Sequence, residues 1–139
     1  MSSCDVSPKK VTNQQDYNNY LELAENKTLQ HAENNKEFWT AKLQQHPEQH
    51  TLLGKTAASN SHLFSATGNI DYLKKAEADL LKLNEFHDYK NPGALMSLAS
   101  NYISQHKFRE SLELLTKAEL IGDYRNDIDK MIFDVQLEL

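Results

Sequence analysis

The side chains best suited to chemistry are three histidines that lie close together in the sequence. His46 and His50 are four residues apart, which is the spacing that zinc hydrolases use on one helix face, with a glutamate next to a histidine. Here Pro47 interrupts the helix and Glu48 touches neither histidine in sequence, so this pattern argues against a catalytic zinc site. A metal-binding or hydrolytic protein that uses His46, His50 and His62 remains our alternative hypothesis.

Two other sequence features resemble catalytic motifs less closely. Residues 54–56, Gly-Lys-Thr, match the end of a phosphate-binding loop, but that loop needs an earlier glycine where this chain has Gln49, and a buried strand before it. Cys4, the only cysteine, lies far in sequence from the histidines and has no partner that would activate it as a nucleophile. We therefore predict a protein without catalytic residues, cofactor or metal.

The surroundings of Cys4 suggest a different role. Small residues, Ser2 and Ser3, precede it and a polar stretch follows, which resembles the end of a bacterial lipoprotein signal. That resemblance implies lipidation of Cys4 and a place in the bacterial cell envelope if Cys4 is the mature N-terminus. The basic and apolar regions of a signal peptide are absent. Without lipidation we expect a free cysteine in a disordered leader, residues 1–15, and a cytoplasmic protein.

Composition favours a soluble, all-α protein of one domain. The chain has 139 residues, of which 39% are hydrophobic and 25% charged. Valine and isoleucine together number only eight, so residues that favour strands are scarce. A formal charge of −5 and dispersed lysines argue against nucleic-acid binding. No apolar run is long enough for a transmembrane helix, so a lipid on Cys4 would be the only attachment to a membrane.

Glycine and proline divide the chain into segments of helical length. Pro47, Gly68, Pro92 and Gly122 mark the breaks, and apolar residues recur at helical spacing between them. We expect Asp71 to cap one of the helices. Six or seven helices are predicted, over residues 16–25, 27–46, 48–67, 70–86, 92–106, 108–121 and 127–139.

Residues 94–119 then show a more specific pattern, in which small residues recur between large ones. Leucine, leucine, alanine and tyrosine keep the spacing of the W-x2-L-G-x2-Y pattern, and small and large residues continue it one helix later. The segment resembles a tetratricopeptide repeat. The physical reason for such a pattern is that small residues let two antiparallel helices approach closely, while large residues fill the gaps on either side. The matching residues are Leu95, Leu98, Ala99, Tyr102, Ser111, Leu115 and Ala118.

The resemblance implies a single helical-repeat domain over residues 16–139. Within it we predict N-terminal cap helices (16–47), a degenerate repeat (48–91), the best-matched repeat (92–125) and a capping helix or start of a further repeat (126–139). Stacked hairpins of this family form a short right-handed superhelix, an α-solenoid, whose first helices line a concave groove. The implied function is a non-enzymatic interaction module or scaffold. An architectural fragment of a longer array is a further alternative.

The family's groove-lining face, carried onto this sequence, selects six residues. Two of them are acidic in the last helix, and residues 120–139 hold five acidic residues against Arg125 and Lys130. We therefore expect a protein or peptide partner with apolar and basic side chains rather than an acidic tail. The predicted groove residues are Met96, Ser100, Ile103, Asp127, Lys130 and Asp134.

Overall fold

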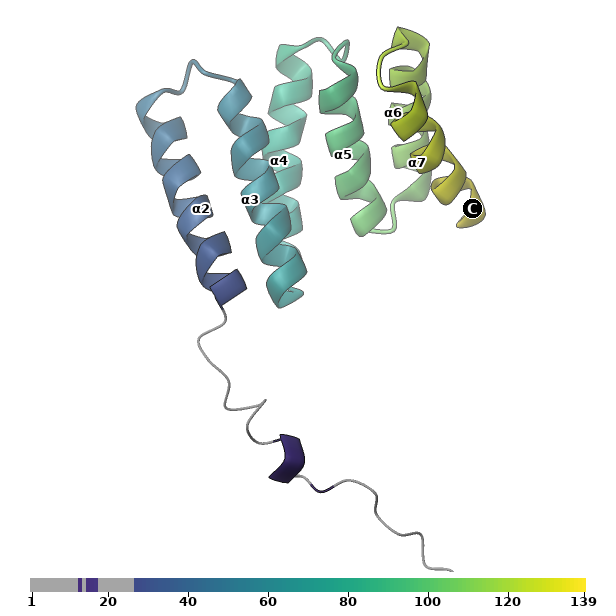
Figure 1. Ribbon diagram of the computed structural model, residues 1–139. Helices are drawn as coiled ribbons and strands as arrows, with labels where there is room; N and C mark the ends of the chain where they lie inside the picture. The colour runs from purple at the N-terminus through teal and green to yellow at the C-terminus, as the bar shows by residue number, and fades with distance from the viewer. Residues whose placement is uncertain (1–12, 14, 18–26) are drawn as a thin grey trace, which may run out of the picture.

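The protein is all-α over the residues that the computed structural model describes, which are 13, 15–17 and 27–139. Residues 15–17 are helical and six longer helices follow, in agreement with the six or seven predicted (Figure 1). The predicted helix over residues 16–25 and the leader with Cys4 lie almost entirely outside the described residues. The six helices are α2 (Lys27–Gln45), α3 (Thr51–Thr67), α4 (Ile70–Phe86), α5 (Pro92–Ser104), α6 (Phe108–Ile121) and α7 (Arg125–Leu137).

Local sequence explains where most of these helices begin and end. Gly68 and Gly122 follow α3 and α6 with φ angles of 68° and 94°, a left-handed conformation that costs glycine nothing and ends a helix. Pro92 is the first residue of α5. A backbone N–H at this position would have no partner within the helix, so proline, which lacks one, costs nothing there. The side chain of Asn91 caps the same helix by accepting a hydrogen bond from the Ala94 backbone N–H at 3.0 Å.

Several predicted boundaries differ from the structure, and the first two are the end of α2 at Gln45 rather than 46 and the start of α3 at Thr51 rather than 48. Asn69, not Asp71, caps α4, because its side chain accepts from the Asp71 backbone N–H at 3.0 Å and Asp71 lies within the first turn. Helix α5 ends at Ser104 rather than near 106, since His106 has a φ of 57°. Helix α7 begins at Arg125 and ends at Leu137, two residues earlier at each end than predicted.

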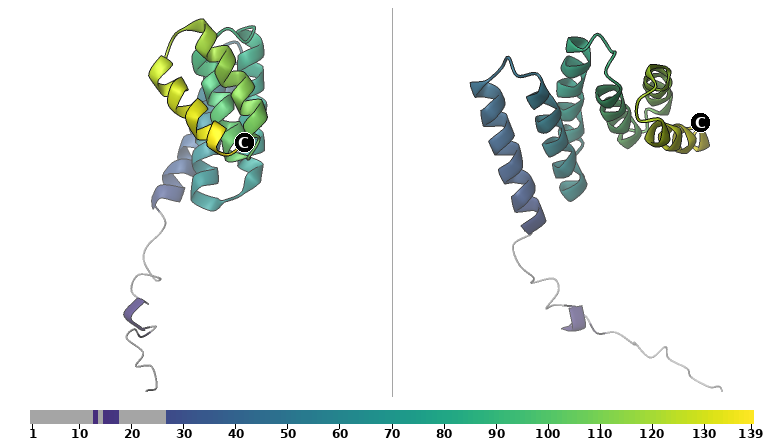
Figure 2. Two further views of the ribbon diagram at one scale, coloured as in Figure 1. Left: turned by 90° about the vertical axis from the view of Figure 1, so that its right-hand side faces the viewer. Right: turned by 45° about the horizontal axis from the view of Figure 1, so that its top comes forward.

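The helices run alternately up and down and follow one another in a row (Figures 1 and 2). Each packs against the next one in sequence, and α3 also contacts α5. This arrangement places α4 against α3 and α5, and α6 against α5 and α7.

The core consists of four small clusters built to the same plan. Each takes buried residues from three consecutive helices, either α3, α4 and α5 or α5, α6 and α7. Helix α5 therefore contributes to all four clusters and connects the helix pair α3–α4 to the pair α6–α7. The clusters are Ala57–Ala76–Leu80–Leu98, Leu53–Leu83–Ala94, Leu95–Ala118–Ile128 and Ala99–Leu115–Val135.

Buried amides add two polar links between α4 and α5. Asn84 Nδ2 donates to the Leu80 and Ala94 carbonyl oxygens at 2.9 and 3.0 Å, and Asn101 Nδ2 donates to the Leu73 carbonyl oxygen at 3.0 Å. A buried amide has no water to bond to and needs a partner within the protein. These contacts therefore fix how α5 is positioned against α4. The sequence pattern had not indicated either asparagine.

An ion pair strengthens the same junction from its edge. Lys107 Nζ lies 3.1 Å from Glu77 Oε2, and Gln105 Nε2 donates to that oxygen at 2.8 Å. Near α2 the packing is looser: Trp39 is half-buried, and Phe38 is 52% exposed.

Candidate functional site

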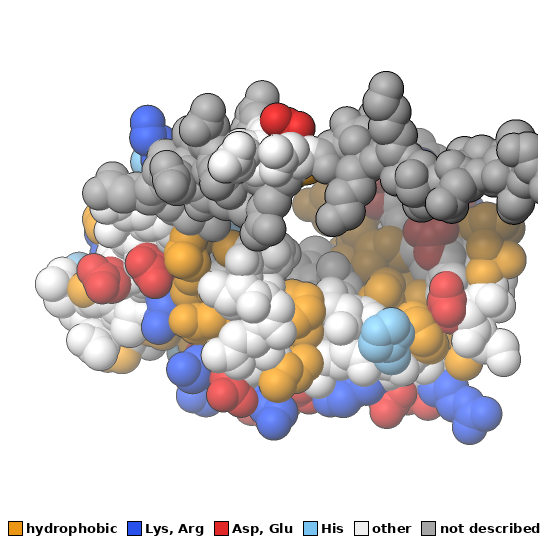
Figure 3. Space-filling view, turned by 90° about the horizontal axis from the view of Figure 1, so that it is seen from below, with side chains coloured by type: hydrophobic (Ala, Val, Ile, Leu, Met, Phe, Trp, Pro, Cys, Tyr) orange, Lys and Arg blue, Asp and Glu red, His pale blue; other side chains and the backbone are white. Residues whose placement is uncertain are grey.

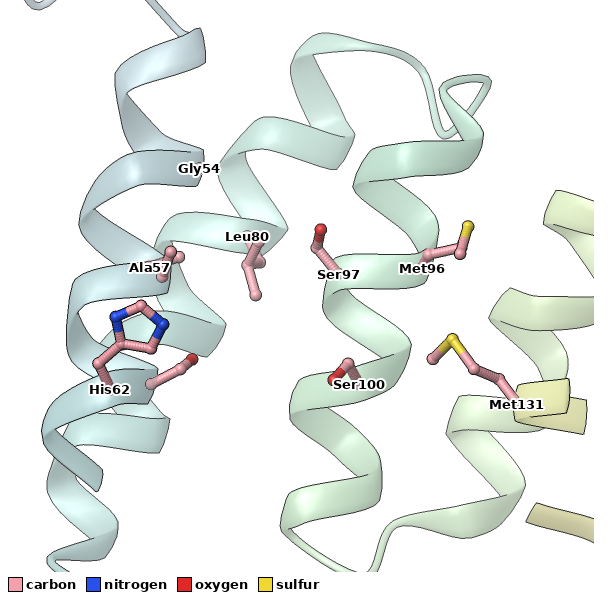
Figure 4. A pocket seen from close by; sticks show the side chains of 10 residues that line it. Gly54, Ala57, His62, Leu80, Met96, Ser97, Ser100 and Met131 are labelled. Carbon is pink, nitrogen blue, oxygen red and sulfur yellow. The ribbon is translucent and has the colours of Figure 1, made fainter. Parts of the chain in front are cut away.

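The main candidate site is a groove across one side of the row of helices, which we call the central groove. It has a volume of about 380 Å³. Its lining comes from α3, α5 and α7, with one residue from α4 (Figure 4). The alternate helices thus share a surface although they are separated in sequence. The lining residues are Gly54, Ala57, Ala58, Ser61, His62, Leu80, Met96, Ser97, Ser100 and Met131.

Most residues that line this groove have small side chains, and two methionines lie at one end of it. The α3 side is formed by glycine, alanine and serine together with His62, and α5 presents Ser97 and Ser100 (Figure 4). Met96 and Met131 lie at the α5–α7 end. Because methionine is flexible and polarisable, it adapts to differently shaped apolar groups. None of the residues lining the groove carries a carboxylate or an ammonium group, so shape and apolar contact dominate there.

The structure distributes the six predicted groove residues over three places. Met96 and Ser100 line the central groove. Ile103 and Asp134 line a second pocket, one helical turn further along α5 and α7. Asp127 and Lys130 are exposed on α7 and lie outside both pockets.

Sequence reasoning missed the contribution of α3 and of Met131. Ala58, Ser61 and His62 were not selected because the repeat pattern is degenerate before Pro92, so the groove-lining face was never carried onto that segment. Small residues at helical spacing from Gly54 to Ser61 were the available signal.

The phosphate-loop resemblance also has a structural explanation. Gly54 and Thr56 lie inside α3, and Thr56 Oγ1 donates to Asp79 Oδ2 of α4 at 2.6 Å. A Cβ at Gly54 would meet Leu83 Cδ2 at 3.5 Å, an ordinary packing distance. The triplet therefore serves the contact between α3 and α4, and its backbone is committed to a helix rather than to a phosphate-binding turn.

The three histidines have separate surroundings. His46 Nδ1 lies 3.5 Å from Glu48 Oε1, and the His50 ring stacks on Phe86 with centroids 3.8 Å apart. His62 lies in the central groove, twelve residues along α3 from His50, which corresponds to roughly 18 Å of helix. Within the part of the chain that the structure describes, no three His, Cys, Asp or Glu side chains form a group that could hold a metal.

One titratable group near the hairpin junction has a perturbed pKa. Partial burial raises the pKa of the Tyr102 phenol above its ordinary value of 10.0, and the negative charge of Glu77 adds to the effect. Lys107 Nζ lies 5.0 Å from the centre of the same ring. The neutral phenol is therefore favoured over the phenolate at this position.

On the space-filling face seen from below, acidic and basic side chains are interspersed along the lower edge (Figure 3). Hydrophobic and uncharged side chains alternate above that edge. This distribution offers no continuous basic strip for a phosphate backbone on this face. No helix among the described residues has the length and apolar character needed to cross a membrane.

We compared the chain with models of protein families, with curated proteins and with solved structures, and it matches none of them.

Proposed function

We propose that the protein is a non-enzymatic interaction module of the tetratricopeptide type, which binds a peptide or partner helix in the central groove. In this proposal α3–α4 and α5–α6 are two stacked hairpins of a short right-handed superhelix, and α7 is the first helix of a third unit or a cap. A groove of this kind binds by complementary shape and needs no reactive residue.

The repeated plan of the core is the observation that carries the proposal. Ala57 and Ala99 occupy matching places, each packed against the second helix of its hairpin and the first helix of the next unit. Such nearest-neighbour packing is what stacked helical repeats require. It supports a superhelix in which α3, α5 and α7 are equivalent first helices lining one surface.

Burial of the repeat-pattern residues supports the same proposal. Six of the seven are at most 1% exposed, and Tyr102 is half-buried. Small Ser111 and Ala118 are buried as completely as the leucines, as expected where two helices of a hairpin approach closely. The six are Leu95, Leu98, Ala99, Ser111, Leu115 and Ala118.

An architectural role within a longer array is a second candidate. Phe133 and Leu137 lie on the outer side of α7 and are 61% and 70% exposed, which is a large apolar exposure for a terminal helix. A further helix packed on this side would cover both residues.

Two matched substitutions test the groove. Ser97 on α5 and Thr116 on α6 are both exposed helical residues with a hydroxyl group. Only Ser97 lines the groove, so Ser97→Tyr fills it, whereas Thr116→Tyr adds the same side chain on a helix that does not line the groove.

A peptide array with the parent protein selects binding sequences, and calorimetric titration then measures each variant. We expect Ser97→Tyr to weaken binding by about tenfold or more and Thr116→Tyr to leave it unchanged. Equal binding by both variants, or no bound peptide at all, would contradict the proposed function.

A further inference from the structure

A second pocket lies between the end of α5 and the end of α7, and we call it the acidic pocket. Its volume is about 250 Å³. Ile103, Phe108 and Val135 give it apolar walls. Asp134, Glu138 and His106 complete the lining with two carboxylates and an imidazole.

The acidic pocket continues the central groove. On α5, Ser100 lines the groove and Ile103 lines the pocket; on α7, Met131 and Asp134 do the same. Residues three apart on a helix lie on one face, so both pockets open along the seam between these two helices. A segment bound in the groove would therefore reach the pocket with a neighbouring side chain.

The two carboxylates of the acidic pocket are not engaged by other side chains of the described residues. Asp134 lies on α7 and Glu138 directly follows the end of that helix, and within the described residues neither makes an ion pair or a side-chain hydrogen bond. Their surroundings are also acidic, because residues 120–139 hold five acidic and two basic residues, a net charge of −3. The local potential therefore favours a cationic guest.

We propose that the acidic pocket receives a lysine or arginine side chain of the partner protein. The methylene stem would pack on Ile103, Phe108 and Val135, and the cationic end would meet Asp134 and Glu138. This inference rests on the proposed function and adds to it the chemistry of one partner residue. It also names Glu138, Phe108 and His106, which the sequence had not indicated.

A small probe tests the pocket without a known partner. N-acetyl-lysine methylamide carries the stem and the charge, and N-acetyl-norleucine methylamide carries the stem alone. We titrate each into the ¹⁵N-labelled full chain and follow the backbone amide signals. The lysine probe is expected to shift Ile103, Phe108, Val135 and Glu138, and to do so less at high salt.

Charge-neutral variants separate the pocket from the general acidity of α7. Asp134→Asn combined with Glu138→Gln should weaken the lysine probe about tenfold and leave the norleucine probe unchanged. The control is Asp123→Asn combined with Asp129→Asn, which removes the same charge from exposed sites outside the pocket. Equal weakening by both double variants, or equal binding of both probes by the parent, would overturn the proposal.

The outcomes distinguish this inference from the proposed function. If an array-selected peptide is blocked by Ser97→Tyr but its lysines can become norleucine without loss, the groove stands and the pocket assignment fails. If the lysine probe binds the pocket but no peptide is blocked by Ser97→Tyr, the groove fails. A parent dimer in sedimentation that the Asp134→Asn, Glu138→Gln variant loses would assign the pocket to a second copy of this chain and overturn our choice of partner.

Discussion

The Ser111 hydroxyl donates a hydrogen bond to the backbone carbonyl oxygen of Ala99 at 3.1 Å, and both residues are completely buried. This contact joins α5 to α6 at a place where both helices carry a small, buried residue. A larger side chain at either position would hold the helices apart. The pair thus gives a physical meaning to the small residues of the repeat pattern.

Enlarging Ala99 should therefore be costly. We expect Ala99→Leu to lower the free energy of unfolding by about 1–3 kcal/mol, because the added atoms overpack the contact with Leu115 and Val135. Ser100→Leu, one residue further on an exposed position, should change it by less than about 0.5 kcal/mol. Urea unfolding followed by circular dichroism measures both variants. A midpoint for Ala99→Leu equal to that of the parent would argue strongly against the hairpin packing.

The two buried asparagines that link α4 to α5 should respond differently to the same substitution. Asn101 Oδ1 accepts from Gln105 Nε2 at 2.6 Å, whereas the buried Asn84 Oδ1 has no partner among the described residues. Asn84→Leu removes that unpaired acceptor along with the donated bonds, so we expect it to be less destabilising than Asn101→Leu by about 1 kcal/mol. Chemical unfolding of the two variants side by side checks the order. The reverse order would show that the amide of Asn84 matters more than its unpaired oxygen suggests.

The raised pKa of Tyr102 predicts a dependence of stability on alkaline pH. A phenol whose pKa is higher in the folded than in the unfolded state stabilises the fold fully below pH 10.0, the ordinary value. This contribution is lost as the pH rises through the folded-state pKa, because the unfolded chain then releases its proton more readily. Burial is the main cause and the charge of Glu77 the second.

The comparison with Tyr102→Phe isolates this effect. The parent should lose free energy of unfolding more steeply than Tyr102→Phe as the pH rises above 10, since phenylalanine has no proton to release. Tyr124→Phe, which removes the phenol of a residue that is 61% exposed, serves as the control for the loss of a surface hydroxyl. Parallel curves for the parent and Tyr102→Phe would mean that Tyr102 titrates as in the unfolded chain.

Helix placement could be predicted well from the sequence because its signals are local. Gly68, Pro92 and Gly122 act through their own backbone geometry, and α4 and α6 have the predicted bounds. The cap of α4 was assigned wrongly because Asn69 and Asp71 are both good capping residues two positions apart. Only the path of the backbone decides between them.

The sites were harder to predict because they depend on helices far apart in sequence. Met96 and Ser100 could be selected from the best-matched repeat, but their neighbours Ser61 and His62 come from α3, where the pattern is degenerate. The acidic pocket adds Phe108 from α6 and Glu138 from beyond α7, and no sequence spacing relates them to Ile103. The α4–α5 links of Asn84 and Asn101 likewise join residues whose proximity exists only in the fold.

If α3, α5 and α7 form one binding surface, a bound peptide should affect backbone amides on all three helices at once. An array-selected peptide is titrated into the ¹⁵N-labelled full chain. We expect the shifted signals to include Ala58 and Ser61 on α3, Ser97 on α5 and Met131 on α7, all of which line the central groove. Shifts confined to one helix, or to α2, α4 and α6 on the rest of the surface, would contradict the account.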